Sequence, residues 1–461
     1  MKKQGKRIDP SFTTMQIICK LLTKNLVFTA FITLVSSRYG YAQCQFLPTR
    51  NFRFEKVTKE LVKKVLSTSK NSSRGYILEC DLTYPEKLHE KHRNFPLCPE
   101  KMEISPDMLS DFQRRCHKQL GTKAKASTKL VASFGKRVKY VIHYENLKLY
   151  LKLGMKLTKV HRILSFDQEP FLKKFIDFCT EMRQKATSSL EKNFFKLISN
   201  SCYGKTIENP SKYLNVSFVT DRKKLRQCMT DPYFHSFKII SKSLVLIFTR
   251  NKKVVIRQPC AVGFTILELS KQFMYDSFYK HIQPAFGAEE CQVCFSDTDS
   301  LFLSVPFSKN PHKKIQHILD ASNFDPSHPL YDESRKSALG YFKSETGSNK
   351  ILKFVGLRSK VYAFQTEKGL SKKCKGISKN YRKQIPFSSY ERCISAINCH
   401  RQEQYTLSSK SHRVSLVKST KLAFSSFDDK TYLLPGGIHS LPYYSSEIVK
   451  NEKKCQFCCV K

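Results

Sequence analysis

The chain has 461 residues, with 81 Lys and Arg against 38 Asp and Glu, which gives a formal net charge of +43. Hydrophobic residues make up 40%, enough for one or two packed cores, so disorder along the whole chain is excluded. The 16 Gly and 18 Pro exclude a collagen-like or low-complexity chain. The large positive charge favours a polyanionic partner, either nucleic acid or an anionic membrane surface, because each Lys or Arg bound to phosphate releases counterions. The 17 Cys, an odd number spread over a long chain, are typical of a reducing, intracellular compartment.

A short apolar run, Leu26 to Val35, follows Lys20 and Lys24. One interpretation is a buried strand or helix of the core. The other is the apolar centre of a signal peptide, or a membrane anchor within residues 15–37. The run is short for a membrane span, which favours the buried element.

The pattern of apolar residues predicts a mixture of helices and strands along the rest of the chain. We expect a helix over 53–68, strands over 75–82, 139–144 and 160–166, a short helix over 145–153, and helices from 171 to about 200. We then expect a short strand over 253–256, a buried helix over 261–279, a strand–turn–strand over 291–305 and two strands over 351–364. The fold class is therefore α+β, with an antiparallel hairpin near the centre of the chain.

Two carboxylates, Asp297 and Asp299, lie between the apolar strands of the 291–305 hairpin. Side chains two apart in an extended segment share a face, so both can point at one spot. Paired carboxylates repel unless a cation lies between them, which in this basic chain indicates a magnesium site that faces phosphate. The alternative is an Asp-rich surface turn.

A basic face is predicted on the helix over 189–205. Lys196, Asn200 and Tyr203 are spaced at i, i+4 and i+7, and Lys192 extends the same face by one turn. An ammonium group can hold a triphosphate, and a tyrosine ring can stack against a base or a sugar. Gly204 allows a turn or the close approach of a ligand. The alternative is a solvated amphipathic helix.

Three segments in order resemble motifs of family B DNA polymerases: Lys-x-x-x-Asn-Ser-x-Tyr-Gly over 196–204, Asp-Thr-Asp-Ser over 297–300, and Lys-Val-Tyr over 360–362. Segments at 75–85, 144–150 and 427–430 resemble the protein-primed branch more closely, in particular the polymerases of Polinton/Maverick-type elements and related viruses. The resemblance covers roughly residues 38–445.

The resemblance implies an enzyme that transfers nucleotides to a primer 3′-hydroxyl with two Mg²⁺ ions. Asp297 and Asp299 would be the catalytic and metal-binding carboxylates. The nucleotide-binding residues would be Lys192, Lys196, Asn200 and Tyr203, and the DNA-binding residues Gly204, Lys360 and Tyr362. The implied partners are a DNA primer–template, deoxynucleoside triphosphates and a protein primer, in the nucleus or in association with a virus or mobile element.

The resemblance also implies a right-hand fold with palm, fingers and thumb and an antiparallel palm sheet. The exonuclease domain of the family has no counterpart here, which indicates an N-terminally truncated polymerase. We expect a divergent segment over 1–37, the palm start and an inserted region over 38–170, and fingers helices over 171–210. The palm with the acidic hairpin would follow over 211–365, and a basic thumb-like region with a tail over 366–461.

The first motif of the family departs from its pattern in this chain. The family places an acid five residues before a Tyr that follows a Leu, whereas here Leu34 stands five residues before Tyr39 and Arg38 replaces the Leu. Glu79 and Asp81 belong to a different strand by the resemblance. Two hypotheses follow: a weakly active or inactive DNA polymerase, or a non-catalytic nucleic-acid-binding remnant. A smaller alternative site is zinc at Cys455, Cys458 and Cys459.

Overall fold

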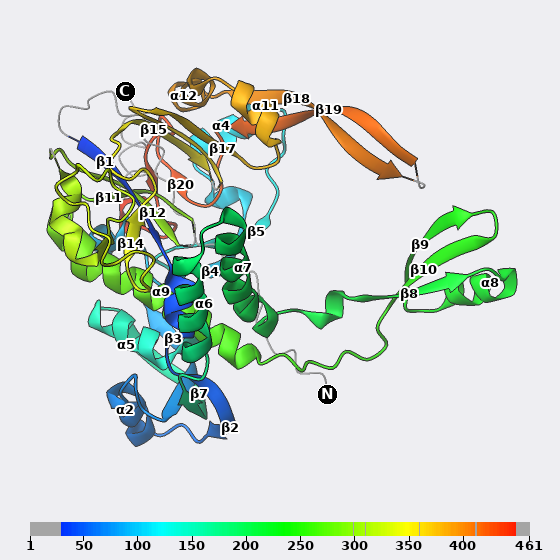
Figure 1. The fold of residues 1–461 in the computed structure, drawn as a ribbon, viewed down its shortest axis with the longest axis horizontal. Coiled ribbons are helices and arrows are strands. Elements are labelled where there is room, and N and C mark those ends of the chain that lie inside the picture. Colours follow the sequence, from blue (N-terminus) through cyan, green and yellow to red (C-terminus); the bar gives the residue numbers. More distant parts are fainter. Residues whose placement is uncertain (1–28, 298, 309, 359, 411–412, 449–461) are drawn as a thin grey trace.

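The structure is a computed structural model that describes residues 29–297, 299–308, 310–358, 360–410 and 413–448. It contains helices and mostly antiparallel sheets, which confirms the predicted α+β class. Figure 1 shows a main body from which two arms project. The tail cysteines and residues 1–28 lie outside the described residues.

The central sheet has the strand order β11-β12-β1-β15-β16-β17. The short β14 pairs with β1, and β13 pairs with β14. Side chains alternate along β1, so that Ile32 and Leu34 enter the main hydrophobic core while Phe31 joins a second core on the opposite face. The strands are β11 (Gln292–Asp297), β12 (Ser300–Pro306), β1 (Thr29–Ser36), β15 (Ile351–Arg358), β16 (Val361–Thr366), β17 (Gly369–Cys374), β13 (Leu319–Asp320) and β14 (Phe342–Ser344).

The apolar run of the N-terminal region contributes β1 to this sheet. Residues 29–36 form a strand that pairs with β12 in antiparallel register, with Leu34 opposite Leu301. The buried-element interpretation is therefore confirmed for residues 29–35, and these residues belong to the central sheet rather than to a separate segment over 1–37. Among the residues that the structure describes, no helix is long and apolar enough to cross a membrane.

A second sheet lies at one end of the body, in the strand order β2-β7-β3-β6. The predicted helix over 53–68 is wrong in its first part, because a strand runs to Glu55 before the helix begins. Thr58 caps that helix, and its hydroxyl accepts a hydrogen bond from the Leu61 amide at 3.2 Å. The elements are β2 (Leu47–Glu55), α2 (Lys59–Ser67), β3 (Arg74–Thr83), α3 (His89–His92), β6 (Arg137–His143), α5 (Tyr144–Lys152) and β7 (Lys156–Glu169).

Helix α9 (Cys260–Ser277) is the buried helix predicted over 261–279 and packs between the two sheets. Before it, α6 (Lys173–Lys185) and α7 (Ser189–Thr206) form an antiparallel pair. Gly263 of α9 allows α7 to approach closely, because a Cβ atom there would lie 2.2 Å from Ile207 and 2.3 Å from Thr206. The end of α7 is thereby held against the core.

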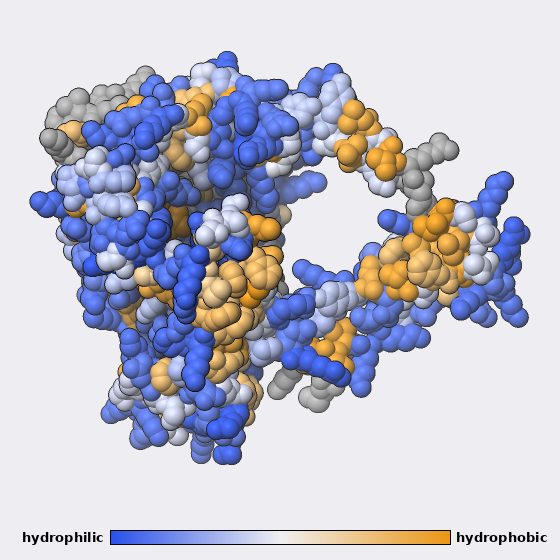
Figure 2. Space-filling model, in the orientation of Figure 1, coloured by the Kyte–Doolittle hydropathy of each residue, from blue (hydrophilic) through white to orange (hydrophobic). Residues whose placement is uncertain are grey.

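Two arms extend from the body (Figure 1). The first arm contains β8 (Leu214–Val219), α8 (Arg222–Thr230), β9 (Phe234–Ser241) and β10 (Leu244–Arg250). Its three strands form a separate sheet, which lies within the region 211–365 assigned to the palm. The predicted strand over 253–256 is wrong, because this exposed run lies in the irregular connection that returns to α9. The second arm is the hairpin of β18 (Cys399–Lys410) and β19 (Arg413–Ser425). Figure 2 shows apolar side chains toward the ends of both arms. The exposed apolar residues of the arms include Phe218 on β8 and Leu407 on β18.

The C-terminal segment is fastened to the body by a buried glutamine on α4 (Asp111–Gln119). The side-chain amide of Gln113 donates to the carbonyl of Asp428 at 2.7 Å and to that of Thr431 at 2.9 Å, and its oxygen accepts from the Ser110 amide at 2.9 Å. The same region contains β4 (Glu100–Ile104), β5 (Ser127–Val131), α11 (Lys379–Gln384), α12 (Phe387–Ser395), β20 (Tyr432–Leu433) and β21 (Ser440–Leu441).

We predict that Gln113→Ala destabilises the protein by about 2–4 kcal/mol, because three buried hydrogen bonds are lost. Thermal unfolding should show a Tm lower by several degrees. Gln227→Ala on the exposed face of α8 is the matched control and should leave Tm unchanged. An unchanged Tm for Gln113→Ala would contradict the proposed fastening.

Candidate active site

The tip of the β11–β12 hairpin carries the two predicted carboxylates. Asp297 ends β11, and Asp299 lies in the turn before Ser300. The Asp299 amide donates to the Asp297 carbonyl at 2.7 Å, and the Ser36 amide donates to the Asp299 carbonyl at 2.8 Å. The tip is therefore tied to the end of β1, and the predicted hairpin is confirmed.

Both carboxylates line one cleft of about 580 Å³. The cleft lies where the end of β1, the hairpin tip, the segment after β14, the β15–β16 turn and β17 come together. Its acidic groups are Asp297, Asp299 and Glu345, and its basic groups are Lys360, Lys373, Lys375 and Arg382. The cleft thus combines ligands for a cation with several charges that suit phosphate.

Glu345 is a cleft carboxylate that the sequence reasoning missed. It directly follows β14, and its amide donates to the Thr33 hydroxyl at 3.2 Å, which places it beside β1. Burial and the charge of Asp299 raise the pKa of Glu345, against the opposing effect of Lys373. The sequence signal for Glu345 was an acid directly after a short strand. That signal could not be connected with the site, because Glu345 and Asp297 are not related by a helix or strand spacing.

The electrostatics of Asp299 also favour a cation in the cleft. Burial raises the pKa of Asp299, and the negative charge of Asp297 acts in the same direction, while Arg38 and Lys196 lower it. The ionised form of Asp299 is therefore costly in the isolated protein, and a bound cation would offset that cost.

The residue at the first-motif acid position faces away from the cleft. Leu34 is 0% exposed and belongs to the main core, between Leu301 of β12 and Ser344 of β14. Its neighbour Val35 lines the cleft instead. Position 35, rather than position 34, is therefore the place on β1 from which a side chain reaches Asp297 and Asp299.

The two acids of β3 are engaged elsewhere. Asp81 accepts from the Lys139 amide at 2.7 Å and contacts His161 at 2.7 Å, and Glu79 forms an ion pair with Arg162 at 2.5 Å. Both belong to the second sheet, in agreement with the expectation that they lie on a different strand.

Helix α7 presents the predicted basic face. Lys192, Lys196 and Asn200 are exposed, whereas Tyr203 is 8% exposed and its ring stacks on that of Tyr39 with centroids 4.9 Å apart. The charge of Lys196 is among the effects that lower the pKa of Asp299. The stack joins the end of α7 to the short helix α1 (Arg38–Gln43), which follows β1.

Gly204 lies inside α7, so the interpretation of this residue as a turn is wrong. A Cβ atom at Gly204 would meet nothing within 4 Å. There is therefore room for a ligand to approach Gly204 closely, and this second interpretation of the residue stays a prediction.

Lys360 and Tyr362 both line the cleft together with the hairpin tip. Lys360 lies in the turn between β15 and β16 with a φ of 60°, a left-handed conformation that is uncommon for a residue with a side chain. The ring of Tyr362 packs against Phe295 of β11, with centroids 4.6 Å apart. The fold therefore brings Asp297, Asp299, Lys360 and Tyr362 into one site although they are separate in the sequence.

The donor set suits Mg²⁺, which proteins bind through one or two carboxylates together with substrate phosphates. Within the described parts of the chain, no three His, Cys, Asp or Glu side chains are close enough to form a complete metal centre by themselves. Carboxylate oxygens that await phosphate oxygens are the arrangement that Mg²⁺ uses at nucleotide sites.

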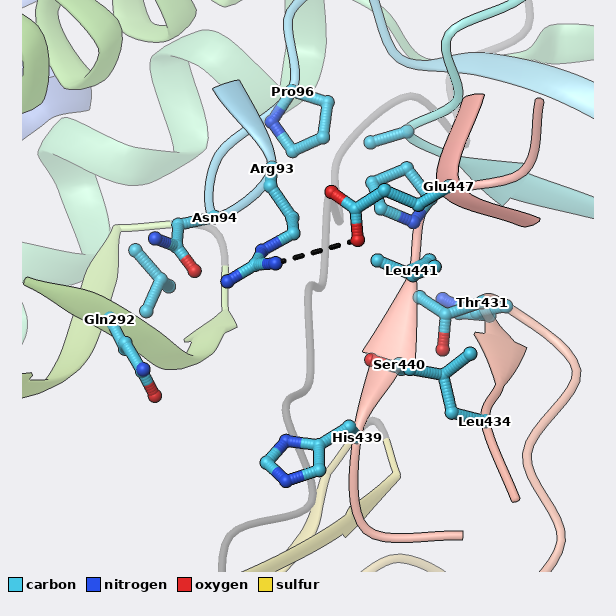
Figure 3. Close-up of a pocket in the computed structure, with 14 residues that line it drawn as sticks. Arg93, Asn94, Pro96, Gln292, Thr431, Leu434, His439, Ser440, Leu441 and Glu447 are labelled. Atoms are coloured by element: carbon cyan, nitrogen blue, oxygen red, sulfur yellow. Dashed lines mark ion pairs between the residues drawn. The ribbon is translucent and has the colours of Figure 1, made fainter. Parts of the chain in front are cut away.

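A second cavity of about 130 Å³ lies at the edge strand β11 (Figure 3). It is enclosed by residues 93–96, by β11 and by the C-terminal segment, and Arg93 forms an ion pair with Glu447 at 3.6 Å across it. Burial lowers the pKa of Lys430 in its wall, and Asp428 offsets part of that effect. The charges of this cavity are compensated within the protein, so it joins two segments rather than presenting reactive groups.

Comparisons with known proteins agree with this geometry. The sequence model for DNA polymerase type B, organellar and viral, matches residues 35–276, more than half of the chain. The chain therefore belongs to this family of DNA polymerases. A search of curated proteins finds no significant match.

Solved structures of phi29 DNA polymerase share the fold. The complex with primer–template DNA has a TM-score of 0.52 at 15% identity, over 88% of this chain and 60% of that one. The complex with primer–template DNA and incoming nucleotides gives 0.52 at 16% identity, over 90% and 61%, and the orthorhombic crystal form gives 0.51 at 16%, over 88% and 61%. The chain thus spans about 60% of the length of these polymerases.

We predict opposite outcomes for an acid introduced at positions 34 and 35. Leu34→Asp places a carboxylate in the apolar core and should cost several kcal/mol, seen as a large fall in Tm. Val35→Asp adds a carboxylate to the cleft, so its Tm should rise on addition of Mg²⁺ by more than that of the unmodified chain. A stable, Mg²⁺-responsive Leu34→Asp protein would show that the assigned register of β1 is wrong.

We also predict that cations of the cleft contribute to the salt dependence of DNA binding. Affinity should fall by orders of magnitude from low to moderate salt. Lys360→Met should reduce the slope of log K against log salt by about one, because one phosphate contact is lost. Lys64→Met on α2 is the matched control with an exposed lysine outside the cleft. Equal slopes for the two variants would remove Lys360 from the DNA-binding surface.

Proposed function

We propose that this chain catalyses template-directed DNA synthesis, the attack of a primer 3′-hydroxyl on the α-phosphorus of a deoxynucleoside triphosphate. The observation that carries the proposal is the single cleft lined by Asp297 and Asp299 together with Lys360 and Tyr362. Membership of the type B DNA polymerase family supports the same activity. Such chemistry depends mainly on positioning and charge neutralisation, which this combination of charges can provide.

In this proposal Asp297 and Asp299 hold Mg²⁺, and Glu345 adds a third carboxylate to the same cleft. Mg²⁺ held there would supply neutralisation of the negative charge that develops during phosphoryl transfer. The carboxylates fix the position at which that charge can be neutralised, because the hairpin tip is tied to β1.

The nucleotide would lie between α7 and the hairpin tip. Lys192 and Lys196 are exposed cations that can hold its triphosphate, and Asn200 lies on the same face to orient the pocket. Tyr203 is fixed by its stack on Tyr39 and would pack under the sugar. These roles follow from the matching motif positions and from the proximity of Lys196 to Asp299.

The DNA would lie along the basic side of the cleft and between the two arms. Lys360 and Tyr362 would touch the primer strand, and Gly204 would allow the DNA to approach α7. Exposed cations lie on both arms: Arg222, Lys223, Lys224 and Arg226 on α8, and Arg401, Lys418 and Lys421 on the hairpin. This distribution of charge suits sequence-independent contact with a phosphate backbone.

We further propose a protein-primed polymerase of a Polinton-type mobile element or a related virus. This finer assignment rests on the segments at 75–85, 144–150 and 427–430. The same resemblance supports a protein primer as an additional partner.

The second candidate function is a non-catalytic nucleic-acid-binding remnant. The burial of Leu34 in the core favours it, because the first-motif position supplies no carboxylate to the cleft. On this reading the chain binds primer–template DNA but does not extend it. The presence of Glu345 in the cleft favours the enzyme instead.

Primer extension with Mg²⁺ distinguishes the two candidates. We expect slow synthesis by the unmodified chain, and a further loss of about 10²–10³-fold in Asp299→Asn, because one electrostatic element of the site is removed. Primer–template affinity should not fall, because an acid that repels phosphate is removed.

Asp332→Asn, which alters a partly exposed acid outside the cleft, is the matched control and should keep the parent rate. Glu345→Gln should lower the rate if Glu345 is the third carboxylate. Synthesis at the parent rate by Asp299→Asn would refute the catalytic assignment. DNA binding with no synthesis by the unmodified chain would support the remnant.

A further inference from the structure

Arg38 is a buried cation at the candidate active site, at a position where the family pattern has Leu. It is the first residue of α1 and is only 5% exposed. Its guanidinium lies over the ring of Tyr39, 4.9 Å from the centroid, and Nη2 is 3.3 Å from the Tyr39 hydroxyl oxygen. Through Tyr39 it contacts the tyrosine stack that includes Tyr203.

The charge of Arg38 lacks a direct counterion in the described part of the chain, where no carboxylate forms an ion pair with it. Its Nε atom is buried without a hydrogen-bond partner, and the same holds for the hydroxyl of Tyr203 and that of Ser37. Burial of an unpaired charge is expensive, and native proteins compensate such groups. Ser37 and Arg38 are adjacent, and the ring of Tyr203 stacks on that of Tyr39, the next residue. Three polar groups without partners so close together indicate a ligand that is anionic and can form hydrogen bonds.

The position of Arg38 identifies the kind of anion. Arg38 begins α1 two residues after Ser36, whose amide donates to the Asp299 carbonyl at 2.8 Å, and Lys196 lies on α7, which packs against α1. The tyrosine stack lies between the same two helices. An anion that enters between α1, α7 and the hairpin tip would therefore meet both cations.

We propose that Arg38 is a phosphate-binding residue for the incoming nucleotide, which acts together with Lys196. This inference rests on the proposed function, because it assumes that a nucleoside triphosphate binds beside Asp299. A guanidinium is ionised at every working pH and can donate two parallel hydrogen bonds to phosphate oxygens. Arg38 thus provides permanent positive charge next to a site whose first-motif position is apolar.

The test measures nucleotide affinity without catalysis. The full chain and the variants Arg38→Leu and Arg38→Lys are titrated with dATP, dAMP and deoxyadenosine in EDTA, and dATP binding is repeated with Ca²⁺ and primer–template. Arg38→Leu should weaken dATP binding by about 10–100-fold, the value expected for a hydrogen bond to a charged group. Deoxyadenosine, which has no phosphate, should bind to both proteins equally, and Arg38→Lys should be intermediate.

Arg50→Leu is the matched control. It removes one guanidinium at an exposed position on β2 and should change dATP affinity less than twofold. Because Arg38 is unpaired, Arg38→Leu should have an unchanged or higher Tm without ligand but should lose most of the rise in Tm that dATP gives. Arg38→Gln, which keeps hydrogen-bonding groups without the charge, repeats the test if Arg38→Leu does not fold.

The results separate this inference from the proposed function. Unchanged dATP affinity in Arg38→Leu overturns the inference even if primer extension is normal. Equal losses for dATP and deoxyadenosine overturn it as well, because Arg38 would then only position the tyrosines. A loss confined to primer–template affinity assigns the anion to DNA and also refutes it. The predicted loss for dATP, in a chain that extends no primer, supports the inference and refutes only the synthesis.

Discussion

The pairing of β1 with β12 on one side and β14 on the other is the constraint on which the site depends. Antiparallel register decides that Val35 faces the cleft and Leu34 the core. The same strand end fixes the hairpin tip through the Ser36–Asp299 hydrogen bond and places Glu345 through Thr33. A slip of one residue in β1 would exchange its two faces and separate the carboxylates from the rest of the cleft.

The cleft contains side chains of both charges, although the chain has a net charge of +43. Cations attract a polyanion, yet two-metal chemistry requires acids at the point of reaction. The fold brings both kinds of side chain to one cleft from different elements. Carboxylates line the hairpin tip and the end of β14, whereas Lys360, Lys373, Lys375 and Arg382 come from the β15–β16 turn and the segment from β17 onward. Carboxylates that suit a cation and cations that suit phosphate therefore line the same cleft, where burial raises the pKa of Glu345 and Lys373 opposes that rise.

Sequence reasoning found the features that are local. Asp297 and Asp299 lie two residues apart in one hairpin, and the face of α7 repeats at helical spacing, so both could be predicted. Glu345 could not, because its place depends on the pairing of β14 with a strand more than 300 residues earlier. The direction of Leu34 depends on register rather than on composition. The run 253–256 has strand-forming residues but no partner strand, and the sheet of the first arm left no signal that separates it from the palm.

The two departures in the first motif have linked electrostatic consequences. With Leu34 in the core, that position of β1 adds no negative charge to the cleft, which weakens the hold on a metal ion. Arg38, four residues later, adds a buried positive charge beside Asp299. Its repulsion also opposes a cation near that carboxylate, whereas it strengthens the attraction for a nucleotide phosphate. The site is thus shifted from metal binding toward anion binding. Glu345 is the cleft carboxylate that opposes this shift, so in the proposed function Arg38 and Glu345 would act in opposite directions on the binding of a metal ion.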